Sequence, residues 1–192
     1  METHVVMQTE EGVDLEQAIN AHGKAIFRYC HLLLRDYHEA QDAVQTTFLR
    51  AFHSKTSREK VFGEDDLVPW LYKIAYNCCV DILRKRKRYF RFLDKEKSFA
   101  EQNWQIWQNG QTHHMKFTGE DGMTEEVRAA LGKLSPQDRA LVISRLMDDM
   151  DYEQLSQIYN TSAAALRKRY ERAKKKLAQA LREQGLEGTY GK

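Results

Sequence analysis

The sequence predicts an all-α protein made of two small helical domains, the second a helix-turn-helix domain, joined by a flexible linker. Three observations lead to this prediction. Apolar residues recur every three or four positions almost throughout, strand and hairpin signals are nearly absent, and the apolar period fails over 95–122, where polar residues and glycine accumulate. We expect residues 1–12 and 185–192 to be tails, the first of them disordered.

The first domain is predicted over 13–94 and contains three helices. One runs from about Asp14 to Leu34, and Asp36 can cap the next. A polar loop follows over 54–66, and Pro69 is expected in the first turn of the third helix, because proline has no amide hydrogen to donate. The apolar sets expected in the core are Leu15, Ile19, Ile26, Phe27, Cys30 and Leu33 on the first helix, and Ala40, Val44, Phe48, Leu49 and Phe52 on the second.

The second domain is predicted over 123–184. Helix starts are expected at Thr124, at Ser135 with Pro136, and at Asp151, since these side chains accept hydrogen bonds from the free amides of a first turn. The apolar positions of the helix after Pro136 are Leu141, Val142, Leu146 and Met147.

A helix, a short turn and a second helix are predicted over 152–177. The turn contains Asn160, which tolerates a left-handed conformation, and either Thr161 or Ser162 can cap the second helix. The apolar residues are Leu155 and Ile158 on the first helix and Leu166, Tyr170, Ala173 and Leu177 on the second. The second set steps by four, three and four, so it forms one stripe facing a core.

The opposite face of this second helix is basic and begins with small residues. It carries Ala164, Lys168, Arg172 and Lys175, and seven of the ten residues over 167–176 are Lys or Arg. Small residues permit close approach and the cations attract phosphate, so the pattern favours entry into a DNA major groove. We expect Arg167 to face the groove as well, and Glu171 to accept from a cytosine amine. The alternative is a basic face that only keeps the domain soluble.

A second basic run closes the third helix of the first domain. Five consecutive cations over 84–88 are followed by Tyr89, Phe90, Arg91 and Phe92, so the basic run continues into aromatic residues. This combination suits single-stranded or melting DNA, because the cations attract its phosphates and unpaired bases can stack on the aromatic rings. The alternative is a favourable cationic helix end followed by core aromatics. Both interpretations are compatible, because phosphates need only the cations.

Composition excludes several classes of protein. Thirty basic and 28 acidic residues leave a net charge of only +2, so affinity for nucleic acid depends on where the charges lie. No apolar run is long enough to cross a bilayer, and no membrane insertion is expected. The three cysteines lack metal-site spacing and are expected to be buried, with no metal or cofactor. Trp104 and Trp107, in the linker, either pack locally or anchor a partner.

Three segments, in this order, resemble those of extracytoplasmic-function sigma factors, subunits that give RNA polymerase its promoter specificity. Residues 39–52 are similar to the family's polymerase-binding helix, whose pattern is D-A-E-D-x-x-Q-x-x-F-L-R-x-[WFY]. Residues 69–84 resemble its promoter-melting helix, and 134–177 its second conserved domain.

The resemblance implies a role for each domain. The first domain, sigma region 2, would bind core polymerase and melt the −10 element, and the second, region 4, would bind the −35 element. The implied polymerase contacts are Asp42, Gln45, Phe48 and Leu49. The implied −10 contacts are Asn77, Lys73, Arg84, Lys85, Arg86 and Arg88, and the −35 contacts are Ala164, Arg167, Lys168, Glu171, Arg172 and Lys175.

The implied partners are core polymerase, at its clamp and flap, promoter DNA and an anti-sigma factor. The implied location of this chain is the cytoplasm, and the nucleoid when polymerase is bound. One rival interpretation is a conventional helix-turn-helix regulator with an N-terminal sensing domain. Another is a metal-dependent nuclease that uses Asp148, Asp149 and Asp151. Adjacent carboxylates point in different directions, and no His or Glu stands at helical spacing to complete a metal site with them. We therefore expect no catalytic residues.

Overall fold

The computed structural model describes residues 8–9, 12–13, 15–54, 64–93 and 123–184, and the structural statements below concern these residues. In chain order the elements are β1 (Gln8–Thr9), β2 (Gly12–Val13), α1 (Leu15–Leu34), α2 (Tyr37–His53), α4 (Glu64–Leu93), α6 (Glu125–Gly132), α7 (Pro136–Leu146), α8 (Tyr152–Tyr159) and α9 (Ala163–Arg182). The fold is all-helical as predicted, apart from the antiparallel β1–β2 pair. Most of the predicted loop, the linker 95–122 with Trp104 and Trp107, and the tail 185–192 lie outside the described residues.

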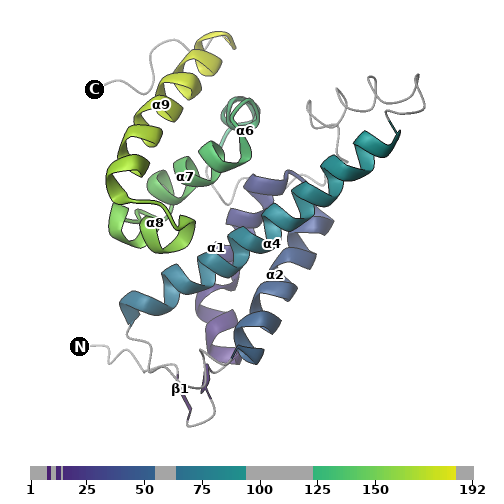
Figure 1. Cartoon of the computed structure of the whole chain (residues 1–192), viewed down its shortest axis with the longest axis vertical. Helices are drawn as coiled ribbons and strands as arrows, with labels where there is room; N and C mark the ends of the chain where they lie inside the picture. Colours follow the sequence, from purple (N-terminus) through teal and green to yellow (C-terminus); the bar gives the residue numbers. More distant parts are fainter. Residues whose placement is uncertain (1–7, 10–11, 14, 55–63, 94–122, 185–192) are drawn as a thin grey trace.

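Helices α1, α2 and α4 form the first domain, in which the long α4 crosses the other two (Figure 1). Their core contains Ile26, Leu33 and Leu71, all buried. The three cysteines, Cys30, Cys78 and Cys79, are also buried, which confirms that they act as small apolar residues here. Burial raises the pKa of the Cys78 thiol, so this sulfur is a weak nucleophile.

Three of the predicted helix starts are confirmed by their capping geometry, whereas α6 follows Thr124 without a hydrogen bond from that side chain. Asp36 accepts a hydrogen bond from the Glu39 amide at 2.9 Å, and Ser135 accepts one from Asp138 at 3.2 Å. Asp151 forms a reciprocal capping box with Gln154. Each cap satisfies an amide that the first turn leaves free, so the helices begin where the sequence supplies an acceptor.

The start of α4 differs from the prediction. The helix begins at Glu64, so Pro69 lies inside it and not in its first turn. Proline removes one helical hydrogen bond at this position. Leu67 is nevertheless buried, which shows that the first turns of α4 pack against the domain, and this packing outweighs the lost bond.

Four residues predicted to face the core are exposed. They are Ile19, Leu49, Phe52 and Leu146, with 43 to 60% of their surface accessible. Leu49 and Phe52 lie at the edge of the apolar stripe of α2, where the period alone does not decide whether a neighbouring helix covers a residue. The exposed residues on α2 matter for function, because Leu49 is itself a predicted polymerase contact and Phe52 lies one turn beyond it.

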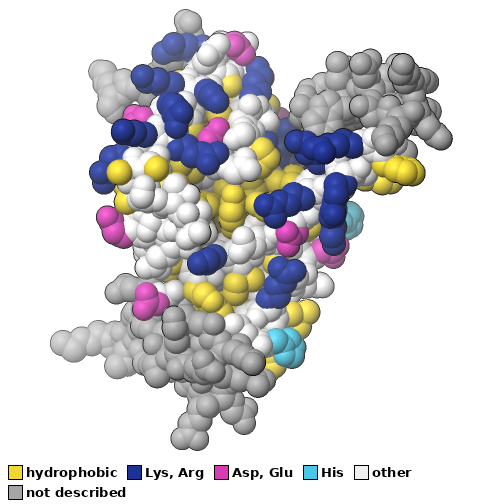
Figure 2. All heavy atoms as spheres, viewed as in Figure 1, with side chains coloured by type: hydrophobic (Ala, Val, Ile, Leu, Met, Phe, Trp, Pro, Cys, Tyr) yellow, Lys and Arg dark blue, Asp and Glu magenta, His cyan; other side chains and the backbone are white. Residues whose placement is uncertain are grey.

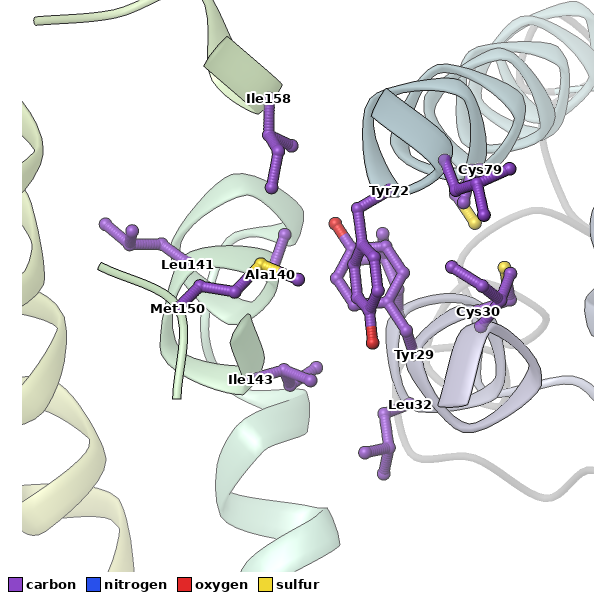
Figure 3. Close-up of a cluster of buried hydrophobic side chains, with 14 of the residues drawn as sticks. Tyr29, Cys30, Leu32, Tyr72, Cys79, Ala140, Leu141, Ile143, Met150 and Ile158 are labelled. Carbon is purple, nitrogen blue, oxygen red and sulfur yellow. The ribbon is translucent and has the colours of Figure 1, made fainter. Parts of the chain in front are cut away.

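Helices α6 to α9 form the second domain, and this domain rests against the first. Helix α7 contacts α1, and α8 contacts α4 (Figure 1). The buried side chains of both domains belong to one continuous cluster, part of which is drawn in Figure 3. The two domains were predicted separately from the sequence, and nothing in the sequence indicated that they pack together.

Candidate nucleic-acid interface

The turn between α8 and α9 fixes the direction of the basic helix. Asn160 has φ 49°, in the left-handed region, as its residue type suggested. Ser162, rather than Thr161, caps α9 by accepting a hydrogen bond from the Ala165 amide at 3.3 Å. Leu166 and Ala173 are buried beneath the helix. The predicted apolar stripe is therefore confirmed, and the opposite face of α9 is turned to the surface.

All six predicted −35 contacts are exposed on that face: Ala164, Arg167, Lys168, Glu171, Arg172 and Lys175. Figure 2 shows Lys and Arg side chains gathered over α9. The first turn contributes only methyl groups, since positions 163–165 are all alanine. A duplex can therefore approach the backbone at this end of α9 while the cations of the following turns reach phosphates or bases.

Not every cation of α9 is available to a ligand. Arg169 donates to Asp138 on α7 at 2.7 Å, and Lys174 pairs with Glu171 at 2.9 Å. The Arg167 guanidinium lies 4.8 Å from the centre of the Tyr152 ring, a cation–π contact that holds it in place. Among the described residues no ion pair engages Lys168, Arg172 or Lys175. These three side chains form the face that remains for DNA.

On α4 the predicted −10 contacts separate into two groups. Lys73 and Asn77 are exposed one turn apart, so they share a face of the helix. Arg84, Lys85 and Arg88 are exposed further along, where Tyr89 and Phe92 expose 62% and 76% of their surface. The basic group and the two rings thus lie together near the end of the described part of α4, as the stacking interpretation requires.

Arg86 is used inside the fold. Its guanidinium forms a salt bridge with Glu39 at the start of α2, and its Nη1 donates to the Leu34 carbonyl at the end of α1 at 3.2 Å. Burial lowers the pKa of Arg86, although the group stays charged at neutral pH. Arg86 therefore joins three helices of the first domain, and no pattern in the sequence indicated this role.

Three of the four predicted polymerase contacts on α2 lie on the surface, and the fourth is buried. Asp42, Gln45 and Leu49 are exposed, whereas Phe48 is 3% exposed and belongs to the core. Phe52, which the helical period predicts in the core, is 45% exposed. Positions 42, 45, 49 and 52 step by three, four and three, so they form one surface with two polar and two apolar side chains. That composition is typical of a protein-binding surface.

The three acids of the rival nuclease site do not form one cluster among the described residues. Asp148 pairs with Arg28 of α1, Asp149 is exposed, and Asp151 caps α8. In the described part of the chain no three metal-binding side chains come together. No helix of that part combines the length and the apolar character that a bilayer-spanning segment requires.

Comparison with known proteins gives two family matches. Residues 18–89 match the family model for sigma-70 region 2, and residues 124–177 match that for sigma-70 region 4. The chain is 32% identical over 148 residues to the ECF RNA polymerase sigma factor EcfG of Rhodopseudomonas palustris, covering 77% of this chain and 74% of that protein. It is 25% identical over 170 residues to the ECF RNA polymerase sigma factor SigW of Bacillus subtilis, covering 82% and 83%.

A solved structure has the same fold. The sigma factor RpoE, in complex with the anti-sigma factor NepR from Bartonella quintana, superposes with a TM-score of 0.67 at 24% sequence identity. The match covers 88% of this chain and 97% of that one, so it includes both helical domains.

Proposed function

Because this chain belongs to the extracytoplasmic-function sigma factors and directs transcription initiation, we propose how its two domains divide that work. Residues 13–94 bind core RNA polymerase and melt the −10 element, and residues 123–184 bind the −35 element. The linker over 95–122 connects the two. The observation that carries the proposal is the basic face of α9, which lies on the second helix of a helix-turn-helix and begins with alanines.

Recognition of the −35 element is assigned to α9. Lys168, Arg172 and Lys175 have no competing ion pair in the described residues, so they are free to meet phosphates or base edges. Arg167 is fixed over Tyr152, which limits the side-chain entropy lost when it meets a base. Glu171 accepts from a cytosine amine once its pairing with Lys174 is exchanged for DNA.

Melting of the −10 element is assigned to α4. The Asn77 amide forms hydrogen bonds with a base that has left the stack, and Lys73 lies one turn away to meet the adjacent phosphate. Arg84, Lys85 and Arg88 hold the displaced backbone, with Tyr89 and Phe92 available for stacking. Arg86 is not included, because its bonds to Glu39 and Leu34 hold the domain together.

Polymerase binding is assigned to the α2 stripe of Asp42, Gln45, Leu49 and Phe52. Phe52 replaces Phe48 in this set, because Phe48 is buried and Phe52 is exposed. An exposed leucine and phenylalanine supply apolar area, and the two polar residues supply orientation. The clamp of the polymerase is the expected partner of this stripe, and the flap that of the second domain.

The two rival functions, a regulator with a sensing domain and a nuclease, are not supported. A regulator with an N-terminal sensing domain does not fit, because residues 18–89 match sigma-70 region 2. A nuclease lacks a site, since Asp148 and Asp151 serve structural contacts. Sigma factors are initiation factors, and we propose that this chain catalyses no reaction alone.

Regulation and location follow from the family. Sigma factors act in the cytoplasm with RNA polymerase, and we propose that this chain joins the nucleoid when polymerase is bound. The sigma factor RpoE was solved with the anti-sigma factor NepR, which supports the proposal that an anti-sigma factor also controls this chain.

The assignment of the α2 stripe is tested by co-purification with core polymerase. Changing Asp42→Arg together with Gln45→Arg is expected to abolish binding, because two cations replace the polar half of the stripe. Glu16→Arg with Asn20→Arg makes the same change in net charge at exposed positions of α1 and should leave binding intact. Equal binding by both variants, with native helicity, would remove the stripe from the interface.

A further inference from the structure

Tyr152 lies where three helices of the second domain meet. It is the first residue of α8, and two guanidiniums lie over its ring. That of Arg145 on α7 is 5.3 Å from the ring centre, and that of Arg167 on α9 is 4.8 Å from it. The ring of Tyr170, also on α9, meets the Tyr152 ring edge-on with centres 6.4 Å apart. Of these four residues, only Arg167 was predicted from the sequence to contact DNA.

The orientation of the Tyr152 ring is fixed by its backbone and by a buried neighbour. The residue follows Asp151, whose capping box with Gln154 has hydrogen bonds of 2.8 and 2.9 Å, so the start of α8 keeps one backbone conformation. Tyr170 is buried and belongs to the apolar stripe of α9. A half-buried ring that packs edge-on against a buried ring keeps one orientation. Tyr152 therefore offers a fixed surface beside α9.

Arg145 supports the same ring from α7 and is itself held within the fold. Its Nη1 donates to the Met150 carbonyl, and the same atom lies 3.8 Å from Asp149. The Arg145 side chain is only 26% exposed. Its charge is therefore met by groups of its own turn, and we assign it to the support of Tyr152 and not to DNA.

Arg167 differs from Arg145 because it is open to a ligand. It is exposed, it follows the three alanines of 163–165, and no ion pair engages it among the described residues. The N–H donors of a guanidinium lie in its plane, so a guanidinium that stacks on a ring keeps its donors for other acceptors. Two of these donors can bond to one base edge at once, which is how arginine distinguishes base pairs.

Bidentate bonding to a base requires one side-chain position, whereas an unsupported surface arginine has many. Such an arginine loses rotamer freedom when it meets a base, and this loss weakens the bond. The Tyr152 ring restricts the rotamers of Arg167 before DNA arrives. Attraction to phosphate depends less on exact position than bonding to a base edge does. The ring should therefore improve discrimination between base pairs more than it improves affinity for DNA in general.

The other cations of this face have no aromatic support. In the described part of the second domain no cation–π contact engages Lys168, Arg172 or Lys175. These three side chains can adjust to phosphates or base edges as the DNA approaches. The face of α9 therefore combines one cation in a fixed position with three that adapt, and the fixed position depends on a residue of α8.

We propose that Tyr152 is a specificity-determining residue for the −35 element, because its ring positions Arg167 to read one base pair. Tyr152 acts through Arg167 and is a positioning residue, whose ring and not its hydroxyl carries the effect. This proposal rests on the assignment of α9 to the −35 element. It goes beyond that assignment, because it places a determinant of base-pair selectivity on α8, outside the helix that reads the DNA.

Discrimination between base pairs tests the role of Tyr152. The full-length protein, bound to core polymerase, is titrated with duplexes that carry each single base-pair substitution of the −35 element shared by its mapped promoters, and fluorescence anisotropy measures each affinity. Arg167→Met identifies the base pair that depends on this arginine. Tyr152→Leu is expected to lose roughly three- to tenfold of discrimination at the same base pair and none at the others. The salt dependence of binding should not change, because no phosphate contact is removed.

Further variants separate positioning from a structural role. Tyr152→Phe keeps the ring and should keep native discrimination, and Tyr152→Met provides a second variant without the ring in case Tyr152→Leu does not fold. In Arg167→Met the ring has no arginine to position, so adding Tyr152→Leu should cause no further loss of discrimination. Lys168→Met is the matched control on the same helix, and its effect on affinity should simply multiply with that of Tyr152→Leu.

The outcomes distinguish this proposal from the assignment on which it rests. If the native protein does not discriminate between the −35 duplexes, the assignment of α9 is wrong. If it does, and either Arg167→Met or Tyr152→Leu discriminates as well as the native protein, the positioning proposal is wrong. It is also wrong if Tyr152→Phe loses as much discrimination as Tyr152→Leu, or if Tyr152→Leu weakens binding to all duplexes equally.

Discussion

The basic end of α4 and the basic face of α9 have similar compositions but different uses. On α9, Lys168, Arg172 and Lys175 point to the surface, whereas Arg169 bonds to Asp138 on α7. On α4, Arg86 in the centre of the run joins three helices. The difference shows that a run of cations contains both structural and ligand-binding residues. A cation is structural where an acceptor from a distant part of the sequence bonds to it.

Arg139 is the extreme case of a structural cation. It is 7% exposed, has no carboxylate partner among the described residues, and donates to four backbone carbonyls. Burial, and then the nearby cations Arg35 and Arg86, lower the pKa of Arg139 to about 10, so it remains charged at neutral pH. The comparison between structural and surface cations leads to four predictions, given in order of expected size.

Replacing Arg139 should have the largest effect. Arg139→Met is expected to lower the free energy of unfolding by about 3–5 kcal/mol, because it leaves several buried carbonyls unpaired. Urea unfolding followed by circular dichroism measures this change. Lys168→Met, on the exposed face of α9, should stay within about 0.5 kcal/mol of the native protein. A similar loss of unfolding free energy in both variants would contradict the distinction between structural and surface cations.

Two arginines of α4 should separate stability from DNA binding. Arg86→Met is expected to cost about 1.5–3 kcal/mol of stability, since it leaves Glu39 without its charged partner. Arg84→Met should leave stability nearly unchanged, because Arg84 is exposed, and should weaken binding of the holoenzyme to a pre-melted promoter. Urea unfolding and filter binding measure the two properties. If Arg84→Met destabilises the domain as much as Arg86→Met, Arg84 also has a structural role.

Two arginines of α9 should show the same separation for the −35 element. Arg172→Ala is expected to weaken binding to a −35 duplex by about 1–3 kcal/mol without destabilising the domain. Arg169→Ala should instead destabilise the domain, because it breaks the bond to Asp138. Fluorescence anisotropy and thermal unfolding provide the two measurements. An unaltered affinity for Arg172→Ala would remove this residue from the interface.

The smallest effect concerns pH. Burial alone would raise the pKa of Asp138, but hydrogen bonds from Arg169 and Ser135 outweigh it and lower this pKa below its usual value. The ionised form is therefore the one that stabilises the domain. This stabilisation is present above the ordinary carboxyl pKa, near 4, and is lost as the pH falls through the lowered value. Asp138→Asn should reduce the acid dependence of the melting temperature, and an unchanged dependence would contradict the assignment.

Local features of the fold were predictable from the sequence because they depend on neighbouring residues. The caps at Asp36, Ser135 and Asp151 and the left-handed Asn160 each follow from one side chain and its adjacent backbone. The stripe of α9 follows from helical periodicity. These features were sufficient to place the helix-turn-helix and its exposed face correctly.

The features that were missed depend on distant residues. Arg86 meets Glu39 across 47 positions, and Arg139 meets Leu33 across 106, so no local pattern shows that either is buried. The exposure of Phe52 depends on which helix covers the edge of α2, and the early start of α4 depends on packing around Leu67. The contact between the two domains is the largest feature that local patterns do not show, since it joins α1 and α4 to α7 and α8.

In vitro transcription with purified core polymerase shows whether this chain directs initiation at promoters of its own. Core enzyme is supplied with genomic DNA with and without this protein, and the 5′ ends of the transcripts are mapped. We expect new start sites that appear only with the protein and share two upstream elements, near −35 and −10. Arg172→Ala should weaken preference within the first element, and Asn77→Ala should reduce strand opening at the second. Identical start sites with and without the protein would mean that this chain does not direct initiation.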